Sequence, residues 1–371
     1  MKGTVHYETR GEIALLSIDN PPVNPLSSGV RQGLFDGMTK ALADEAVKAV
    51  VITGLNRAFI AGADISEFGA AASEGVGLGE ALEIMENSTK PVIAAINGTA
   101  FGGGLETALC CDYRIAAPTA PVGLPEVKLG LLPGAGGTQR LPRLIGAQAA
   151  LKAIVSGDPI MAPQAQKLGI VDRIAEGDIV EEGIKYAEEI VAAGSATRKI
   201  RDLTDKIAGD KGNTAVFENA AAQLNKTNRG QFAPAQILKC VEAAVNADSF
   251  DAGMAVEREC FAACMQDPQR EALIHIFFAE RAANKIPGLS KDDPLIDINK
   301  GSVIGSGTMG GGIAMCFANA GIPVRLHDNN AENLAKGLKV IEGNYARTVS
   351  KGRLTQEAMD KRMSLIIPTE N

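Results

Sequence analysis

Tryptophan is absent from this 371-residue chain, and histidine occurs only three times, at His6, His275 and His327. Histidine is the most common protein ligand of zinc and related metals, and these three residues lie far apart in the sequence. The sequence therefore predicts no histidine-based metal site, and we expect no metal cofactor.

Cysteine is also scarce. The six residues include one adjacent pair and one pair four positions apart, a pattern that forms neither a disulfide framework nor paired zinc half-sites. We expect these cysteines to be reduced and mostly buried. They are Cys110, Cys111, Cys240, Cys260, Cys264 and Cys316.

Long apolar runs and basic runs are missing too. No apolar segment approaches the roughly 18 residues of a membrane helix, and charges and prolines interrupt the N-terminal segment too early for a signal peptide. The 44 acidic residues outnumber the 37 basic ones, and the formal net charge is −7. This balance disfavours a nucleic-acid-binding surface. We expect a soluble intracellular protein with no membrane-spanning segment and no nucleic-acid partner.

What the chain does contain is 46% apolar residues and a length sufficient for two domains. Residues 4–9 and 12–18 alternate as in a hairpin, and a helical pattern covers about 27–44. The apolar runs 47–53 and 92–96 predict short buried strands, the first of them followed by a loop at 56–68. Strand, glycine-bearing loop and helix recur in this part of the chain.

The next part of the sequence is mostly helical, and almost wholly so over residues 197–285. An amphipathic helix at 270–285 is followed by a segment rich in proline, glycine and aspartate, Ile286–Pro294, which predicts a domain boundary. Beyond it, residues 300–328 predict a strand, a glycine-rich turn, a helix and a second strand.

The strongest chemical signal lies in the middle of the first domain. A triple glycine, Gly102–Gly104, leads directly into a helix that carries Glu106, whereas Glu126 follows a proline and precedes a second glycine turn at Gly134–Gly137. Because glycine has no Cβ, the backbone can approach a substrate closely, and amides at a helix N-terminus favour negative charge. The loop Ala61–Asp64 can supply another amide. The pattern predicts an oxyanion hole beside two acid/base carboxylates.

Each carboxylate by itself also has an ordinary interpretation, because Glu106 can simply cap or solvate its helix and Glu126 can be a loop acid. Carboxylates in mostly apolar surroundings cost stability unless they have partners. Their combination with two glycine turns and an amide-bearing loop therefore favours a functional site.

Three runs strongly resemble the enoyl-CoA hydratase (crotonase) family over roughly the first 190 residues: AFIAGADISEF, NGTAFGGGLETAL and GLPEVKLGLLPGAGGTQRLPR. The helical extension, the run FFAERAANK and the following glycine motif resemble the multifunctional enzymes of fatty-acid β-oxidation. In those enzymes a hydratase/isomerase is joined to a 3-hydroxyacyl-CoA dehydrogenase. The resemblance implies an α/β fold with a crotonase-type ββα spiral domain at 1–190, a helical extension at 191–269, a linker helix and loop at 270–296, and the first part of a Rossmann NAD-binding domain at 297–371.

By these motifs, the resemblance implies that Glu106 and Glu126 are the catalytic pair and that the amides of Ala63 and Gly103 hold the thioester oxygen. Water held between the carboxylates and near the Gly134 amide would add to Cβ of a trans-2-enoyl-CoA substrate. Glu106 would take the water proton, and Glu126 would exchange the proton at Cα. The same carboxylates, moving a proton between Cα and Cγ, imply an additional Δ3-Δ2-enoyl-CoA isomerase activity.

The phosphates of CoA need a cationic partner. Arg57 occupies a position where the family often has a lysine and is therefore a candidate contact for the ADP moiety, although a solvated loop residue is the alternative. A second lysine of the family is replaced here by Ser66.

Gly305, Gly307 and Gly310 form a G-x-G-x-x-G motif between an apolar lead-in and an apolar helix, and Asp328 ends the next predicted strand. This context is typical of dinucleotide binding, in which the acid bonds the adenosine ribose and favours NAD over NADP. The alternative is a tight structural turn.

The resembling multifunctional enzymes carry their dehydrogenase histidine and its glutamate partner farther along the chain, whereas His327 is the only histidine of this second domain. We therefore expect a truncated chain without dehydrogenase activity. A thiolase is an expected partner, and the expected location is the bacterial cytoplasm, or the peroxisome in a eukaryote.

Other functions are kept as alternatives. The main rival is a different crotonase-type reaction on a CoA thioester, such as hydrolysis or decarboxylation, and two glutamates at the matching positions favour hydration over these. An RNA-binding or interaction module on the same fold is a second alternative. A simple NAD-binding regulator leaves residues 56–140 unexplained.

Overall fold

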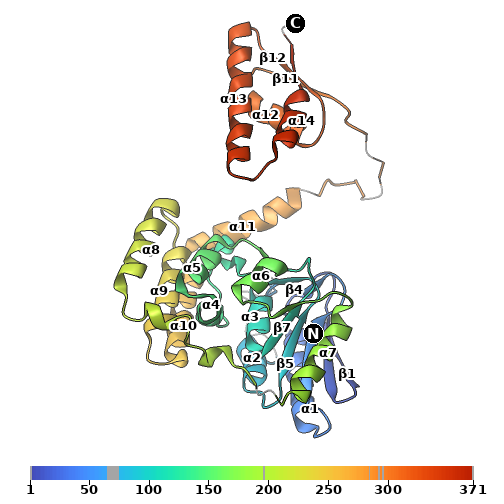
Figure 1. Ribbon diagram of the computed structural model, residues 1–371, viewed down its shortest axis with the longest axis vertical. Coiled ribbons are helices and arrows are strands. Elements are labelled where there is room, and N and C mark those ends of the chain that lie inside the picture. The colour runs from blue at the N-terminus through green and yellow to red at the C-terminus, as the bar shows by residue number, and fades with distance from the viewer. Residues whose placement is uncertain are drawn as a thin grey trace. The chain divides into compact units, whose positions relative to one another are not determined.

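The protein is represented by a computed structural model that describes residues 2–64, 75–194, 197–283, 285–290, 293–294 and 296–369 (Figure 1). The chain divides into two compact units, Met1–Asn284 and Lys285–Asn371. Each unit has its own hydrophobic core. Ser66 and part of the loop predicted at 56–68 lie outside the described residues.

Six strands form the larger sheet of unit 1, in the spatial order β1 (Thr4–Arg10), β2 (Ile13–Asp19), β3 (Ala49–Gly54), β5 (Val92–Ile96), β7 (Tyr113–Ala116) and β10 (Arg173–Ile174). The first two strands form the predicted antiparallel hairpin, and all other neighbours are parallel. β3 and β5 are buried along their whole lengths. This explains their continuous apolar sequences, because a parallel sheet is covered on both faces.

A second sheet of short strands has the order β4 (Ala58–Ile60), β6 (Thr99–Phe101), β8 (Pro121–Gly123) and β9 (Ile160–Met161). β4, β6 and β8 are parallel to one another. Each of them follows a strand of the larger sheet along the chain, so that β3, β5 and β7 lead into β4, β6 and β8. This alternation is the structural basis of the repeat seen in the sequence. The loop predicted at 56–68 is therefore wrong in part, because it contains β4.

Helices cover both faces of the larger sheet. One face packs on a core shared with α1 (Ser28–Ala43), α2 (Leu78–Glu86) and α3 (Gly103–Cys110). The other packs on α7 (Ile179–Ala192), whose buried residues are Gly183, Ile184, Tyr186, Ala187 and Ile190. The described residues of this region also form α4 (Gly137–Ile145), α5 (Ala147–Ser156), α6 (Ala162–Leu168) and the 3₁₀ helix η2 (Pro125–Leu129).

The helical extension contains α8 (Thr214–Thr227), α9 (Ala233–Asn246), α10 (Phe250–Gln266) and α11 (Pro268–Ala283), preceded by the short 3₁₀ helices η3 (Ile200–Asp202) and η4 (Ala208–Asp210). The prediction of nearly continuous helix over 197–285 is wrong for its first part. There, Arg198 and Lys199 bond to the buried Asp112 instead of continuing a helix, with Arg198 N 2.7 Å from Asp112 Oδ1. Gly209 and Gly212 further disfavour helix in this segment.

Unit 2 contains a three-stranded parallel sheet in the order β11 (Gly301–Ile304), β12 (Val324–His327) and β13 (Ile366–Thr369). Its helices are α12 (Thr308–Asn319), α13 (Ala331–Ser350) and α14 (Gln356–Ser364). The predicted strand, glycine turn, helix and strand are confirmed, whereas β13 was not predicted. Within the described residues, no helix combines the length and apolarity needed to cross a bilayer.

All six cysteines are free, as predicted. Five of them are buried, and Cys316 is exposed.

Candidate active site

The candidate site lies at the carboxyl ends of three neighbouring strands. β4, β6 and β8 are parallel and adjacent, so their carboxyl ends meet at one edge of the smaller sheet. Ala63, Gly103 and Glu126 each follow one of these strands within three residues. Residues more than 60 positions apart in the sequence are thus brought to one edge, a place where parallel sheets commonly bind ligands.

The backbone amides of Ala63 and Gly103 lie close together. A Cβ built on Gly103 would lie 3.7 Å from the Ala63 nitrogen. The Ala63 loop is held by Leu26, which forms a parallel bridge with Ala63 and donates its N–H to the Gly62 oxygen at 2.9 Å. Gly104 allows α3 to approach β4, because a Cβ there would lie 2.0 Å from the Ile60 oxygen. The triple glycine therefore allows the start of α3 to pack against the Ala63 loop.

Glu106 lies on the first turn of α3 and is only 2% exposed. Its Oε1 accepts hydrogen bonds from the backbone amides of Ala135 and Gly137, each at 2.8 Å. Burial raises the pKa of Glu106, while these two hydrogen bonds and the charge of Arg140 oppose that rise. The carboxylate is therefore held in a fixed orientation by the second glycine turn.

Glu126 lies on η2 and faces the turn before α3. Gly102 has a φ of +54°, a conformation that favours glycine, and a Cβ there would lie 3.0 Å from Glu126 Oε1 and crowd this carboxylate. The other oxygen, Oε2, is buried without a hydrogen-bond partner among the described residues. Burial and the charge of Glu106 raise the pKa of Glu126 well above its usual value. Glu126 is thus suited to hold and deliver a proton.

A cavity of about 630 Å³ connects these groups. It is lined by Ala63, Gly103, Glu106, Glu126 and Gly134, which are five of the six residues predicted for this site. Most of the other lining residues are apolar, including Leu78, Leu129, Leu131, Leu132, Phe261, Leu273, Ile276 and Phe277. The sixth predicted residue, Arg57, is exposed after β3 and is not among the described residues that line the cavity.

Glu257, a buried carboxylate behind the second glycine turn, was not predicted from the sequence. It lies on α10 with 0% exposure and accepts hydrogen bonds from Gly136 N at 2.7 Å and Thr138 N at 3.2 Å, as well as from the Thr138 hydroxyl. The available signal was a charged residue at helical spacing from the buried Cys260 and Cys264. The apolar residues that α10 and α11 contribute to the cavity were not predicted from the sequence either.

Glu257 makes the stability of the fold depend on pH. Burial, followed by the charge of Glu106, raises the pKa of Glu257 from an ordinary value of 4.5 to about 8. Between these two values the folded chain holds a proton that the unfolded chain has released, so the stabilisation is complete at low pH and is lost as the pH rises. We expect the melting temperature to fall from about pH 5 to pH 8, and Glu257→Gln to make that decrease smaller, because Glu257 no longer titrates while Glu106 and Glu126, whose pKa values are also raised, still do. Thermal unfolding followed by circular dichroism measures both slopes, and equal slopes would contradict the assignment.

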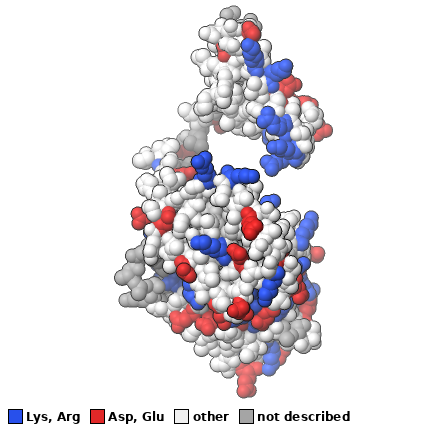
Figure 2. Space-filling model, turned by 90° about the vertical axis from the view of Figure 1, so that its left-hand side faces the viewer, with Lys and Arg blue, Asp and Glu red and all other residues white. Residues whose placement is uncertain are grey.

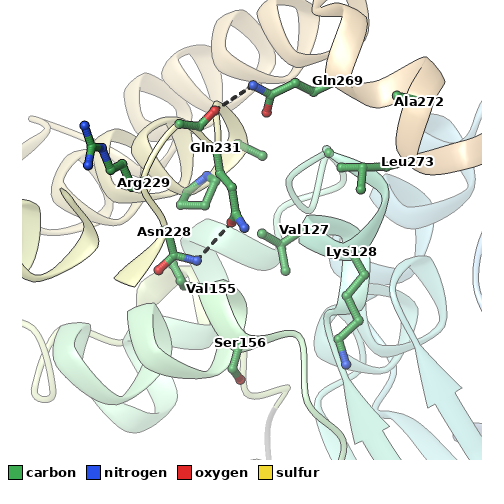
Figure 3. A pocket seen from close by; sticks show the side chains of 14 residues that line it. Val127, Lys128, Val155, Ser156, Asn228, Arg229, Gln231, Gln269, Ala272 and Leu273 are labelled. Carbon is green, nitrogen blue, oxygen red and sulfur yellow. Dashed lines mark hydrogen bonds between the residues drawn. The ribbon is translucent and has the colours of Figure 1, made fainter. Parts of the chain in front are cut away.

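A second cavity, of about 510 Å³, shares Lys128 and Leu273 with the first (Figure 3). Its polar side chains bond to their neighbours: Asn228 donates to Gln231 at 3.0 Å, and Gln269 donates to the Gly230 oxygen at 2.7 Å. It contains none of the predicted site residues, so we assign the chemistry to the cavity with the two glutamates.

In unit 2 the glycine motif forms a tight turn between β11 and α12. Gly305 has a φ of +93°, and a Cβ on Gly310 would lie 1.7 Å from the Gly305 oxygen, so both positions need glycine. Asp328 Oδ2 accepts hydrogen bonds from Ser306 N and Oγ, each at 2.8 Å, and these bonds lower the pKa of Asp328. Gly307 and Asp328 line a cavity of about 400 Å³.

Fold and site together define a class of protein: an α/β chain of crotonase fold in which the buried Glu106, the half-buried Glu126 and closely approaching backbone amides face one largely apolar cavity, followed by the beginning of a dinucleotide-binding fold. Residues 8–233 match the family model described as enoyl-CoA hydratase/isomerase. The chain belongs to this family. Residues 300–371 match the NAD-binding domain of 3-hydroxyacyl-CoA dehydrogenase. The predicted fold class and the joining of these two families in one chain are confirmed.

Similar proteins have the same combination. The chain is 42% identical over 347 residues to a peroxisomal bifunctional enzyme of Cavia porcellus, covering 92% of this chain and 47% of that protein. It is 36% identical over 365 residues to a peroxisomal fatty acid β-oxidation multifunctional protein of Arabidopsis thaliana, covering 95% and 50%. The chain therefore spans about half the length of the curated relatives it matches. A crystal structure of carnitinyl-CoA hydratase from Mycobacterium avium superimposes with a TM-score of 0.56 and 28% identity, covering 76% of this chain and 97% of that one.

Proposed function

We propose that unit 1 catalyses the addition of water to trans-2-enoyl-CoA thioesters of fatty-acid β-oxidation. One observation supports this above all: Glu106 and Glu126, both with raised pKa values, line one apolar cavity together with the amides of Ala63 and Gly103. Acid/base chemistry next to an oxyanion site is what hydration of a conjugated thioester requires.

In the proposed reaction Glu106 takes a proton from water while the water oxygen bonds to Cβ. Glu126 delivers its proton to Cα, so the double bond is consumed and the charge that builds on the thioester oxygen is neutralised. During this step the Ala63 and Gly103 amides donate to that oxygen, and losing one such donor typically costs about 2.7–4 kcal/mol of barrier. We place the attacking water near the Gly134 amide in this proposal, because Gly134 also lines the cavity.

The same pair of carboxylates supports an isomerase reaction. Removal of a proton from Cα or Cγ gives the same delocalised enolate, and its return at the other carbon moves the double bond between the Δ3 and Δ2 positions. The enolate oxygen uses the same two amides. We therefore propose Δ3-Δ2-enoyl-CoA isomerase activity at this cavity.

The product distinguishes this function from its rivals. Nuclear magnetic resonance of a reaction with crotonyl-CoA should show 3-hydroxybutyryl-CoA with the thioester intact. Release of free CoA would instead identify a thioester hydrolase. Retention of RNA without turnover of the thioester would favour an interaction module. In the face shown in Figure 2, acidic and basic side chains both occur in small patches.

Unit 2 is the proposed NAD site, in the cavity lined by Gly307 and Asp328 beside the Gly305–Gly310 turn. Asp328 has its second oxygen, Oδ1, at 3.3 Å from Asn330 N, while Oδ2 orients the turn through Ser306. We propose that this carboxylate bonds the adenosine ribose and selects NAD over NADP, as the NAD-binding part of a 3-hydroxyacyl-CoA dehydrogenase. NAD would supply the hydride acceptor for that oxidation.

Asp328→Ala is expected to weaken NAD binding by about 10–100-fold, because a charged hydrogen bond to the ribose and the anchor of the glycine turn are both lost. Isothermal titration calorimetry of the whole chain with NAD measures the change. Asp360→Ala, on the exposed side of α14, serves as the control. Equal affinity of wild type and Asp328→Ala for NAD would refute the assignment.

The remaining assignments follow from the same function. We propose Arg57 as a contact for the CoA phosphates, since the residue is exposed and forms no ion pair with another described residue that would compete with a phosphate. A thiolase is the proposed partner that consumes the 3-ketoacyl product of a complete oxidation. We propose a cytoplasmic location in a bacterium or a peroxisomal one in a eukaryote, the latter supported by the names of the relatives.

A further inference from the structure

One face of α10 packs along the whole second glycine turn. Gly253, Glu257 and Phe261 are spaced by four residues and therefore lie on one face of the helix. A Cβ on Gly253 would lie 2.2 Å from Gln139 Oε1, and a Cβ on Gly134 would lie 2.6 Å from the Phe261 ring. The helix thus lies close to Gly134 at the start of the turn and to Gln139 just after its end, and Glu257 is placed between these contacts.

Two carboxylates accept hydrogen bonds from alternating backbone amides of the turn. Glu106 accepts from the amides of Ala135 and Gly137, whereas Glu257 accepts from those of Gly136 and Thr138. Gly136 has a φ of +95°, a conformation that favours glycine, in the middle of this alternation. A displacement of the Gly136 or Thr138 amide therefore also displaces the two amides that orient Glu106.

We propose that Glu257 is a positioning residue of the active site: by holding the Gly136–Thr138 backbone from α10, it fixes the amides that keep the Glu106 carboxylate oriented as the base. Glu257 does not line the cavity of the two glutamates, so its effect is transmitted through the turn. It also lies beyond residue 233, where the match to the hydratase/isomerase family model ends. The helical extension is thereby part of the catalytic apparatus.

The inference rests on the proposed hydratase function and predicts a separation of kcat from KM. Whether ionised or protonated, each oxygen of Glu257 keeps a lone pair that can accept a hydrogen bond, whereas the amide nitrogen of glutamine cannot accept one. In Glu257→Gln an N–H donor therefore faces either Gly136 N or the Thr138 amide. The turn must then shift, and we expect kcat for crotonyl-CoA hydration to fall about 10–100-fold, the size of effect expected from a small misplacement of a catalytic group. KM should stay within about twofold, because the residues lining the cavity are unchanged.

Asp112→Asn is the matched control. Asp112 is likewise fully buried and accepts backbone hydrogen bonds, from Val92 N at 2.9 Å and Arg198 N at 2.7 Å, but it does not contact the turn. Its substitution should lower the melting temperature and leave kcat close to that of wild type at a temperature where both variants are folded. This control separates lost stability from lost positioning.

Thr138→Val provides a second variant if Glu257→Gln does not fold. It removes the hydroxyl that donates to Glu257 and keeps the backbone amide, so kcat should fall by a smaller factor, with KM again unchanged. Steady-state kinetics of the whole chain test the set. The positioning role would be overturned if Glu257→Gln keeps the kcat of wild type, or if Asp112→Asn loses as much kcat as Glu257→Gln. If Glu257→Gln does not fold, a wild-type kcat in Thr138→Val would overturn it. A wild-type chain without hydration activity would instead refute the proposed function.

Discussion

Replacing Glu126 by glutamine is expected to lower kcat for crotonyl-CoA hydration by about 10²–10⁴-fold while leaving the affinity for the thioester nearly unchanged. Glutamine is close in size to glutamate but cannot give a carboxyl proton to Cα. We propose Glu126 as the proton carrier because its Oε2 is buried without a hydrogen-bond partner among the described residues and the pKa of its carboxyl group is raised. Stopped-flow or steady-state hydration measures kcat, and equilibrium dialysis of the thioester measures binding.

The matched control for this substitution is Glu188→Gln, an exposed position on α7. It has the same chemical change and no contact with the cavity, so its kcat should equal that of wild type. If Glu126→Gln keeps wild-type turnover, Glu126 is not the residue that protonates Cα.

Glu106→Gln is expected to have an effect of similar size, about 10²–10⁴-fold in kcat, for a different reason. The side-chain oxygen of glutamine can still accept from both Ala135 N and Gly137 N, because a single carboxylate oxygen, Oε1, accepts both bonds in the native protein. The glycine turn should therefore remain in place. What is lost is the second oxygen, which in the native carboxylate can take the proton of water.

Hydrogen exchange at Cα separates the two glutamates. The test uses butyryl-CoA, a saturated acyl-CoA whose Cα hydrogens can exchange with deuterated solvent. This exchange needs a carboxylate near Cα and the two amides at the thioester oxygen, but it needs no attacking water. Glu106→Gln should retain this exchange, and Glu126→Gln should lose it. Mass spectrometry of the recovered thioester measures the deuterium. The reverse pattern would exchange the roles of the two residues.

Much of the site could be predicted from sequence because its parts lie in short, distinctive motifs. Glycine is required at Gly104, where a Cβ would lie only 2.0 Å from the Ile60 oxygen, and favoured at Gly102, which has a φ of +54°. The motif is therefore a sequence sign of the close approach of α3 to β4. Glu106 follows two residues later on the same helix. The hairpin and the strand Val92–Ile96 were also predictable, from alternation and from a continuous apolar run.

The missed features depend on tertiary contacts. β4, β6 and β8 have only three residues each, too few for any periodic pattern, and they exist because they pair with one another. Glu257 lies 119 residues from its partner Thr138, in a helix whose sequence gives no sign of a bonding partner. The residues from α10 and α11 that line the cavity, such as Phe261 and Ile276, read in the sequence as ordinary apolar positions of helices.

The central claim is that unit 1 hydrates a 2-enoyl-CoA by means of Glu106 and Glu126 acting together. The most direct test is the rate at which the whole chain consumes crotonyl-CoA, followed by the loss of the absorbance of the conjugated thioester, in wild type and in the double variant Glu106→Gln/Glu126→Gln. The account predicts rapid conversion to 3-hydroxybutyryl-CoA by wild type, independent of added NAD, and no conversion above background by the double variant. A wild-type chain without turnover, or a double variant that retains it, would contradict the account.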